Sequence, residues 1–529
     1  MVRDTGQNDS TTGKHSGTYG NTVLGRISEL AGIIRLVQTI NNCHAMKKVF
    51  LFIVCVVVFM SCSKTDINEP FSGTDLKAGA ASPAVFIVEP NGSDDTPALV
   101  QAFEDAKAAG TGSIVILVEG EYKVGYMEIY DFYGSLQGAG KGQTVITVLP
   151  GIDLNELFAR HQLHCMIKFI GGDVCLSNFT IRTPPGRLST GGPGWGHIYS
   201  LMSFSSFNPL YEPGNESRTI NVTIDNVSFK GQRMEEGGYP GYTGYSYNCV
   251  MGVRAGFDYY PIYSVPENLL PREKIDFKII NSDFETFCYG IAIEGTMNSR
   301  LIIGEKNNGN VFSNTDQDGG IWENRNAEVS IEGNTFNITE FGYGIDLDDY
   351  PWYKIFRSEP SEKPTIFNVQ NNAFKMTHSE YALFLRNTRA RSFPEEPPVI
   401  YNIKNNVFSM ADGYEWGIIS YFTKGIVIRN NMLTGYGDLA LYLVNWSQGG
   451  LVMGNNFSTA VLGTGVAYLT ASTKDWTFIG GNADGLVINY GTNNLFAGFS
   501  VSKSDVPFGQ TIVDNLQATK DALKELKNH

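Results

Sequence analysis

The stretches VIYNIKNNVF (residues 399–408) and IVIRNNML (residues 426–433) share one pattern. Apolar residues alternate with polar ones, an Asn follows, and a large apolar residue stands two positions after that Asn. The pattern recurs through the second half of the chain, at Asn310, Asn334, Asn372, Asn406, Asn431 and Asn455. The spacings are 24, 38, 34, 25 and 24 residues, and the two long intervals contain polar, Pro-rich inserts. A period near 24 residues is typical of stacked supersecondary units.

Two alternating apolar stretches flank each Asn, as at 329–331 before Asn334 and 344–347 after it. Period-two alternation predicts half-buried strands. Asn suits a tight corner, because it tolerates a left-handed backbone and its amide can bond to the adjacent coil. A leucine-rich repeat shares the core spacing, but its connecting segments would be helical, whereas here they consist of strand patterns and Gly turns. The pattern therefore predicts an all-β solenoid, a parallel β-helix.

Residues 94–146 predict how this coil begins. Thr96 can cap a helix, Pro97 suits its first position, and apolar residues recur at helical spacing until Gly110. The order DDTPALVQAF, IVILVEGEYKV and LQGAGKGQTVI (starting at residues 94, 114 and 136) resembles the start of pectate-lyase-like β-helix proteins. The resemblance implies a right-handed parallel β-helix (solenoid) with a short N-terminal capping helix, and it implies no particular reaction.

Residues 46–62 indicate export. Met46-Lys47-Lys48 is followed by an apolar run to Met60 and by Ser61-Cys62, which is the order of a signal peptide. The run is too short for a bilayer span of about 20 residues. Its end resembles a bacterial lipobox with Cys62 as the lipidated residue, although Phe59 replaces the usual Leu. We therefore expect a lipoprotein of the bacterial cell envelope, lipid-anchored to the outer membrane.

The domain boundaries expected from these patterns are as follows. Residues 1–45 are a non-native upstream extension, 46–61 the signal peptide, 62–84 a flexible tether, 85–515 the β-helix, and 516–529 a polar helical tail. The formal net charge of −14 argues against nucleic acid as a partner, because phosphate contacts need clustered Lys and Arg. Cys249 and Cys288 are expected on neighbouring coils, either as a disulfide or as buried thiols.

The strands that follow each Asn predict two outward columns when they are aligned by their inward aliphatic residues. One column holds Gly252, Ala292, Trp322, Asp346, Phe384 and Ile419, and the next holds Arg254, Glu294, Asn324, Asp348, Arg386 and Tyr421. Asp346 and Asp348 should have Cα atoms about 6.5–7 Å apart on one strand. Glu294, two coils away, should lie at about 9–10 Å.

Paired carboxylates beside aromatic rings favour polysaccharide chemistry. An inverting glycoside hydrolase needs two carboxyl groups about 6.5–9.5 Å apart, so Asp346 and Asp348, supported by Glu294, are the catalytic candidates. The substrate-binding candidates are Arg254, Trp322, Phe384, Arg386, Tyr421 and Trp352. The GIDLDD strand (residues 344–349) is similar to the paired-Asp strands of polygalacturonase-type β-helix hydrolases. That family's Gly-His-Gly and Arg-x-Lys companions are missing, so its residue roles do not carry over.

Other interpretations stay open at this stage. One is a Ca²⁺-assisted polysaccharide lyase with Arg386 or Lys354 as the base, in which Asp346, Asp348, Asp349 and Glu294 supply oxygens to the cation. Another is a glycan-binding or adhesive lipoprotein without catalysis. In a third, the outward charges only form solvated ion pairs. Apart from Ca²⁺ no cofactor is expected, and the expected partners are a polysaccharide or oligosaccharide and, through the lipid, a membrane.

Overall fold

The computed structural model describes a large part of the chain beyond residue 82. The described residues are 83–151, 165–183, 198–206, 219–231, 249–256, 274–285, 289–294, 299–315, 321–324, 327–339, 342–348, 365–377, 379, 381–387, 399–411, 413, 415–457, 460–482, 487–497 and 511–512. They all belong to the second of two compact units, residues 80–529. The predicted extension, signal peptide, Cys62 and C-terminal tail lie outside them. Within the described residues, no helix is long and apolar enough to cross a membrane.

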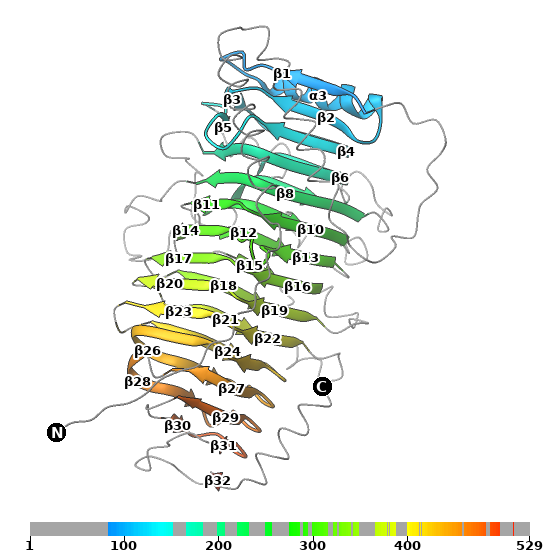
Figure 1. Cartoon of the computed structure of the whole chain (residues 1–529). Coiled ribbons are helices and arrows are strands. Elements are labelled where there is room, and N and C mark those ends of the chain that lie inside the picture. Colours follow the sequence, from blue (N-terminus) through cyan, green and yellow to red (C-terminus); the bar gives the residue numbers. More distant parts are fainter. Residues whose placement is uncertain are drawn as a thin grey trace, which may run out of the picture. The chain divides into compact units, whose positions relative to one another are not determined.

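The described residues form a right-handed parallel β-helix, as predicted. Strands of successive coils stack from β1 to β32 along one axis (Figure 1). Every pairing between named strands is parallel, and residues of adjacent coils face each other in register, as in Val329↔Phe367. Each regular coil has three strands rather than the two expected, because the stretch directly after the Asn, such as Thr335–Thr339, forms a strand of its own.

The first sheet contains the strands that precede the Asn corner. Its strands are β1 (Val85–Val88), β2 (Ser113–Leu117), β10 (Lys274–Ile280), β13 (Ser299–Ile303), β16 (Ala327–Glu332), β19 (Ile366–Gln370), β22 (Ile400–Lys404), β25 (Val427–Arg429), β27 (Leu451–Asn456), β29 (Thr477–Asn482), β31 (Leu495–Ala497) and β32 (Thr511–Ile512). The second sheet follows the corner. Its strands are β3 (Gly120–Val124), β5 (Thr144–Val148), β11 (Asp283–Glu285), β14 (Val311–Thr315), β17 (Thr335–Thr339), β20 (Ala373–Thr377) and β23 (Val407–Met410).

The third sheet closes each coil. Its strands are β7 (Ile198–Ser205), β9 (Cys249–Gly256), β12 (Tyr289–Glu294), β15 (Ile321–Asn324), β18 (Tyr343–Asp348), β21 (Tyr381–Arg386), β24 (Trp416–Tyr421) and β30 (Val487–Asn489). Long strands bend from one sheet into the next. They are β4 (Met127–Gly138), β6 (Cys165–Arg182), β8 (Thr219–Lys230), β26 (Met432–Val444) and β28 (Ala460–Leu469).

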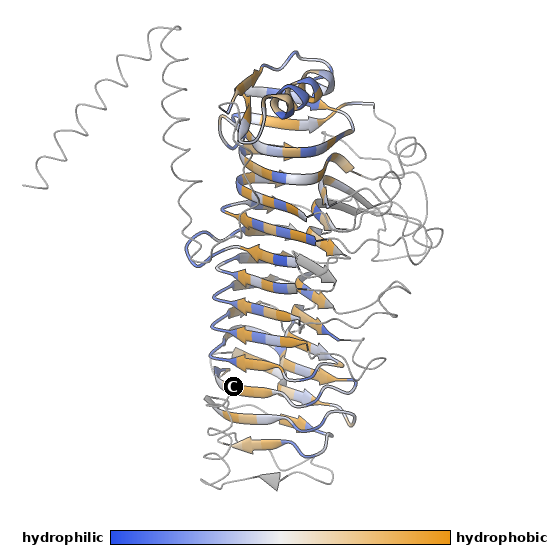
Figure 2. Cartoon of the chain, turned by 90° about the vertical axis from the view of Figure 1, so that its right-hand side faces the viewer, coloured by the Kyte–Doolittle hydropathy of each residue, from blue (hydrophilic) through white to orange (hydrophobic). Residues whose placement is uncertain are grey.

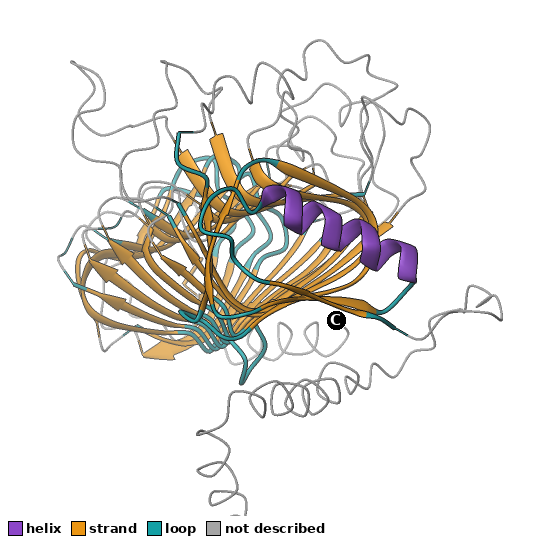
Figure 3. Cartoon of the chain, turned by 90° about the horizontal axis from the view of Figure 1, so that it is seen from above, coloured by secondary structure: helices purple, strands orange, loops and turns teal. Residues whose placement is uncertain are grey.

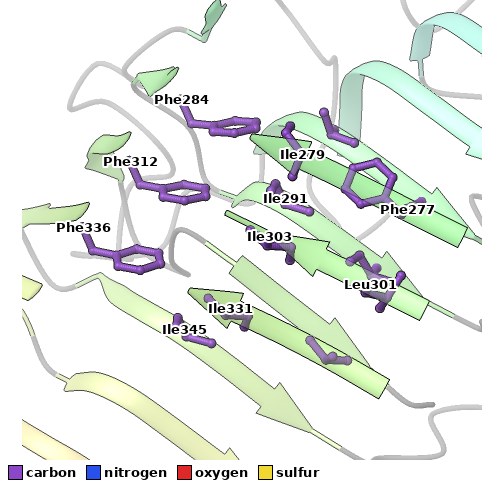
Figure 4. Packing of buried hydrophobic residues seen from close by; sticks show 14 of the residues in the cluster. Phe277, Ile279, Phe284, Ile291, Leu301, Ile303, Phe312, Ile331, Phe336 and Ile345 are labelled. Atoms are coloured by element: carbon purple, nitrogen blue, oxygen red, sulfur yellow. The ribbon is translucent and has the colours of Figure 1, made fainter. Parts of the chain in front are cut away.

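The interior is filled by side chains that alternate with outward polar ones, and the alternation is visible along the strands in Figure 2. The large apolar residue two positions after each Asn lies in the interior, and from Asn310 to Asn406 it is a Phe. Its ring stacks on the equivalent ring of the next coil, as Phe312 does on Phe336 at 4.7 Å and 7° (Figure 4). The same parallel stack continues through Phe229, Phe284, Phe374 and Phe408. The hydrophobic pattern of the sequence thus fixes the core.

The recurring asparagines form a buried ladder, which confirms the predicted bonding between coils. Asn334 Nδ2 donates to Asn372 Oδ1 at 3.0 Å, and Asn372 repeats the bond to Asn406. Each side chain also donates to a backbone carbonyl, as Asn372 does to Ile331. The left-handed residue is the one before the ladder position, for example Asn371 at φ 57°. The ladder residue itself therefore bonds between coils, and its predecessor makes the turn.

One helix, α3 (Thr96–Ala109), lies across the first end of the stack (Figure 3). Its buried Phe103 ring contacts Phe132 and Phe169 at 5.0 and 5.8 Å, so the helix closes the apolar interior. The predicted capping helix and its end at Gly110 are confirmed. Thr96 does not cap the helix, because Asp95 holds that position and the Thr96 hydroxyl accepts a bond from the Gly125 amide instead.

Candidate functional site

The third sheet is set apart by its connections. Between residues 151 and 399 the long segments that link described strands all begin or end at a strand of this sheet; they are 152–164, 184–197, 207–218, 232–248, 257–273, 349–364 and 388–398. The corner between the first and second sheets stays short in the same coils, as between Glu332 and Thr335. Insertions that gather on one face of a repeat fold commonly mark its binding face.

The register of the third sheet confirms most of the predicted column positions, but Ala292, Asp346 and Ile419, which were predicted to face outward, are buried. Trp322 pairs with Asp346, and Asp346 pairs with Phe384. In the next column, the positions of Glu294, Asn324, Asp348, Arg386 and Tyr421 follow one another from coil to coil. Asp346 and Asp348 are two residues apart on β18, as the paired-carboxylate hypothesis requires.

Arg254 is the exception, and its predicted place was wrong. It pairs with Ala292, so it belongs to the Asp346 column rather than the Asp348 column, and it is buried. Gly252, predicted to face outward in the Asp346 column, lies at the inner corner instead. A Cβ there would meet the Phe284 ring at 2.9 Å. The predicted β9 alignment was displaced by two residues because the buried Ala255, rather than Val253, occupies the inward position opposite Ile293.

Asp346, Arg254, Phe384, Arg386 and Tyr421 have described side chains. For Glu294, Trp322 and Asp348 only the strand position is described, and Trp352 lies outside the described residues. Of the predicted Cys249–Cys288 pair, Cys249 has only its strand position described and Cys288 lies outside the described residues, so this pair stays a prediction.

Asp346 and Arg386 form the charged centre of this face. Arg386 Nη2 lies 2.6 Å from Asp346 Oδ2, and the Asp346 side chain is only 7% exposed. The guanidinium carbon of Arg386 lies 4.4 Å from the centre of the Phe384 ring, which adds a cation–π contact. The Tyr401 hydroxyl donates to the Arg386 carbonyl at 2.7 Å. The ion pair fixes the direction of the Asp346 carboxylate, and the other two contacts fix the position of Arg386.

A row of aromatic rings beside this centre was missed in the sequence. Tyr343, Tyr381, Trp416, Tyr442, Tyr468 and Tyr490, which we call the aromatic track, follow one another on successive coils. The centroid distances along the track are 5.1, 5.5, 4.9, 5.5 and 5.7 Å. Phe384 contacts both Tyr343 and Tyr381, so the track begins next to Asp346.

The track faces outward. Tyr442 stands between Leu441 and Leu443, both fully buried, and Tyr468 between the buried Ala467 and Leu469. The rings themselves are half-buried, and Tyr490 is 41% exposed. Burial raises the pKa of Tyr442 above 10.0, with a smaller contribution from Tyr468, so its hydroxyl stays a hydrogen-bond donor at neutral pH. Burial likewise raises the pKa of Tyr421, although Arg386 lowers it in part.

Among the side chains that the structure describes, no group of three His, Cys, Asp or Glu residues is placed to hold a metal ion. The Ca²⁺ hypothesis rested on Asp346 together with Asp348, Asp349 and Glu294. Only Asp346 of this set has a described side chain, and it is paired with Arg386. A cation site at this position therefore stays a prediction.

Comparison with known proteins gives a likeness in fold. No family model matches the chain, and no curated protein matches its sequence. Among solved structures, the A-module of a mannuronan C-5 epimerase from Azotobacter vinelandii is 15% identical, with a TM-score of 0.39 over 80% of this chain and 94% of that one. A family 28 exopolygalacturonase from Yersinia enterocolitica is 11% identical, with a TM-score of 0.39 over 82% and 80%. Bacteriophage phi29 gene product 12 is 14% identical, with a TM-score of 0.44 over 80% and 57%.

Proposed function

We propose that this protein is an exported, carbohydrate-active β-helix that binds a polysaccharide on its third sheet and hydrolyses it at Asp346 and Asp348. The observation that carries the proposal is the charged centre of Asp346 and Arg386 at the beginning of the aromatic track. Aromatic side chains combine a large apolar surface with a polar edge, which suits the mixed surface of a sugar ring. A carboxylate adjoining such a surface is placed to act on a bound glycan.

The roles of the two aspartates follow from their surroundings. The contact with Arg386 stabilises the charged form of Asp346, and a charged carboxylate is what a general base needs. Asp346 would accept a proton from the water that attacks the anomeric carbon. Asp348, or Glu294 two coils away, would protonate the departing glycosidic oxygen. The strand spacing of about 6.5–7 Å between alternate residues falls within the range for inverting hydrolases.

The lyase alternative has less support. It needs an Arg or Lys that gives up its proton, and Arg386 is held as a cation by Asp346. The alternative in which the charges of this face only form ion pairs keeps a specific observation in its favour, because Asp346 and Arg386 are in fact paired. Lipid anchoring at Cys62 and an outer-membrane location remain part of the proposal.

The proposal is tested by incubating the purified protein with a panel of polysaccharides. New reducing ends without unsaturated products indicate hydrolysis, unsaturated products indicate a lyase, and retention without products indicates a binder. Asp348→Asn should lower the hydrolytic rate by about 10²–10⁴-fold, the usual contribution of a general acid or base. Glu328→Gln changes an exposed carboxylate on the first sheet and serves as the control. Full activity of Asp348→Asn would reject the proposed site.

A further inference from the structure

The aromatic track has a defined direction on the molecule. Tyr381 and Trp416 occupy one column of the third sheet, Tyr442 and Tyr468 a later column, and Tyr490 comes two residues after Ile488, the partner of Tyr468. The track therefore crosses the sheet obliquely as it moves from coil to coil. With strands about 4.8 Å apart, its six rings cover about 24 Å along the axis, which is enough for several sugar units in a row.

The rings from Trp416 to Tyr468 do not stack face to face, unlike Tyr343 and Tyr381 at the beginning of the track. The Trp416 and Tyr442 planes meet at 69°, and those of Tyr442 and Tyr468 meet at 76°. In an edge-to-face pair, the ring that contributes its edge keeps both faces clear of that neighbour. In this part of the track, neighbouring rings therefore leave ring faces that they do not cover themselves and that a polymer could contact.

From Trp416 to Tyr490, the charges on the strands that carry the track point to an uncharged ligand. Strands β24 and β30 and the third-sheet parts of β26 (438–444) and β28 (465–469) contain no Lys or Arg. Their one charged side chain is Asp438, whose carboxylate accepts a bond from Trp416 Nε1 at 2.9 Å. A polyuronate would place its carboxylates against this acidic group without compensation, in a chain of net charge −14.

We propose that the aromatic track binds consecutive units of an uncharged polysaccharide that extends from Asp346 toward the C-terminal coils. Ring faces of Trp416, Tyr442 and Tyr468 contact the C–H surfaces of the sugars. The phenol hydroxyls and the Asp438 carboxylate bond to sugar hydroxyls. This inference names the substrate class of the function proposed above and rests on it for the position of the reacting bond, but binding along the track can be measured separately.

The test measures the retention of the full-length Asp348→Asn variant in gels that contain one polysaccharide each, so that hydrolysis does not interfere. The probes are neutral glucans, mannans, xylans and galactans, with polygalacturonate and alginate as acidic probes. At least one neutral polymer should retard the protein, and the acidic ones should not. Adding Tyr468→Ala should weaken binding to that polymer by about 5- to 10-fold, and Tyr468→Phe, which keeps the ring, should restore it.

Tyr436→Ala is the matched control, because Tyr436 lies on the same strand β26, is 51% exposed, and belongs to the part paired with the second sheet. Retention by the acidic polymers only, or by none, would overturn the proposal. So would equal losses in Tyr436→Ala and Tyr468→Ala, or a dimer of this chain that Tyr468→Ala dissociates. If neutral polymers bind in a Tyr468-dependent way and the wild type cleaves none of them, binding along the aromatic track is supported and the hydrolase proposal is wrong.

Discussion

Two ladders of aromatic rings run along this molecule, one inside the coil and one outside it. The inner Phe rings lie nearly parallel, at interplanar angles of 1° to 10°, and each covers the faces of its neighbours. The outer rings from Trp416 to Tyr490 meet at 49° to 76°. The same coil repeat thus produces a closed stack where rings serve the core and an open one where ring faces remain available.

Removing one ring from each ladder should give the largest difference in the free energy of unfolding. Phe336→Ala deletes a fully buried ring between Phe312 and Phe374 and should lower the free energy of unfolding by about 3–5 kcal/mol. Tyr468→Ala removes a half-buried outer ring and should lower it by about 1 kcal/mol or less. Urea denaturation of both variants measures the contrast. Equal losses of unfolding free energy in the two variants would mean that the outer rings stabilise the fold as much as the inner ones do.

The Asn ladder tests the same contrast with polar side chains. Asn372→Ala leaves the Asn334 amide groups and the Ile331 carbonyl without their partner and should lower the free energy of unfolding by about 2–4 kcal/mol. Asn402 donates only to Asn368 on the outer face of the first sheet, so Asn402→Ala should change stability by about 0.5 kcal/mol or less. A ladder variant as stable as wild type in thermal unfolding would contradict this account.

An inner tyrosine should make stability depend on alkaline pH. Burial raises the pKa of Tyr122 above its usual 10.0, and its hydroxyl donates to the Val88 carbonyl. Above pH 10 the folded state keeps this phenol proton, whereas the unfolded state loses it. The contribution of Tyr122 to the free energy of unfolding is therefore complete below pH 10 and declines as the pH rises above 10. The decline approaches about 1.4 kcal/mol per pH unit.

Denaturation curves recorded from pH 8 upward measure this slope. Tyr122→Phe should make the alkaline decline shallower, while Tyr133→Phe, at a ring that is 47% exposed, should leave it unchanged. An unaltered slope in Tyr122→Phe would assign the alkaline loss to other groups.

Much of the fold could be predicted because each coil repeats the same local chemistry. The Asn corner, the Phe two positions later and the alternating strand after it determine the core, the turn and the register of β12 to β24. The prediction failed at Arg254, because the small Ala255 rather than a large aliphatic residue occupies the inward position opposite Ile293. It also missed the second strand of each coil, because the bend after this strand has no repeated turn residue as recognisable as Asn.

The candidate site was predicted only in part for a related reason. Asp346, Phe384, Arg386 and Tyr421 share columns that an alignment of inward aliphatic residues reveals. The aromatic track crosses columns, so no single spacing in the sequence connects Trp416 with Tyr442 or Tyr468 with Tyr490. A search for rings at any outward position of consecutive coils would have found it.

The helix across the first end of the stack affects how copies of this protein meet. Without α3, the interior rings Phe132 and Phe169 would lie open at the end of a parallel strand stack, together with the unpaired side of β1. Such an end is a template on which a second chain can continue the same hydrogen bonding. The 14-residue helix α3 therefore covers the end of the hydrophobic core, and in doing so it hinders the head-to-tail growth of fibres.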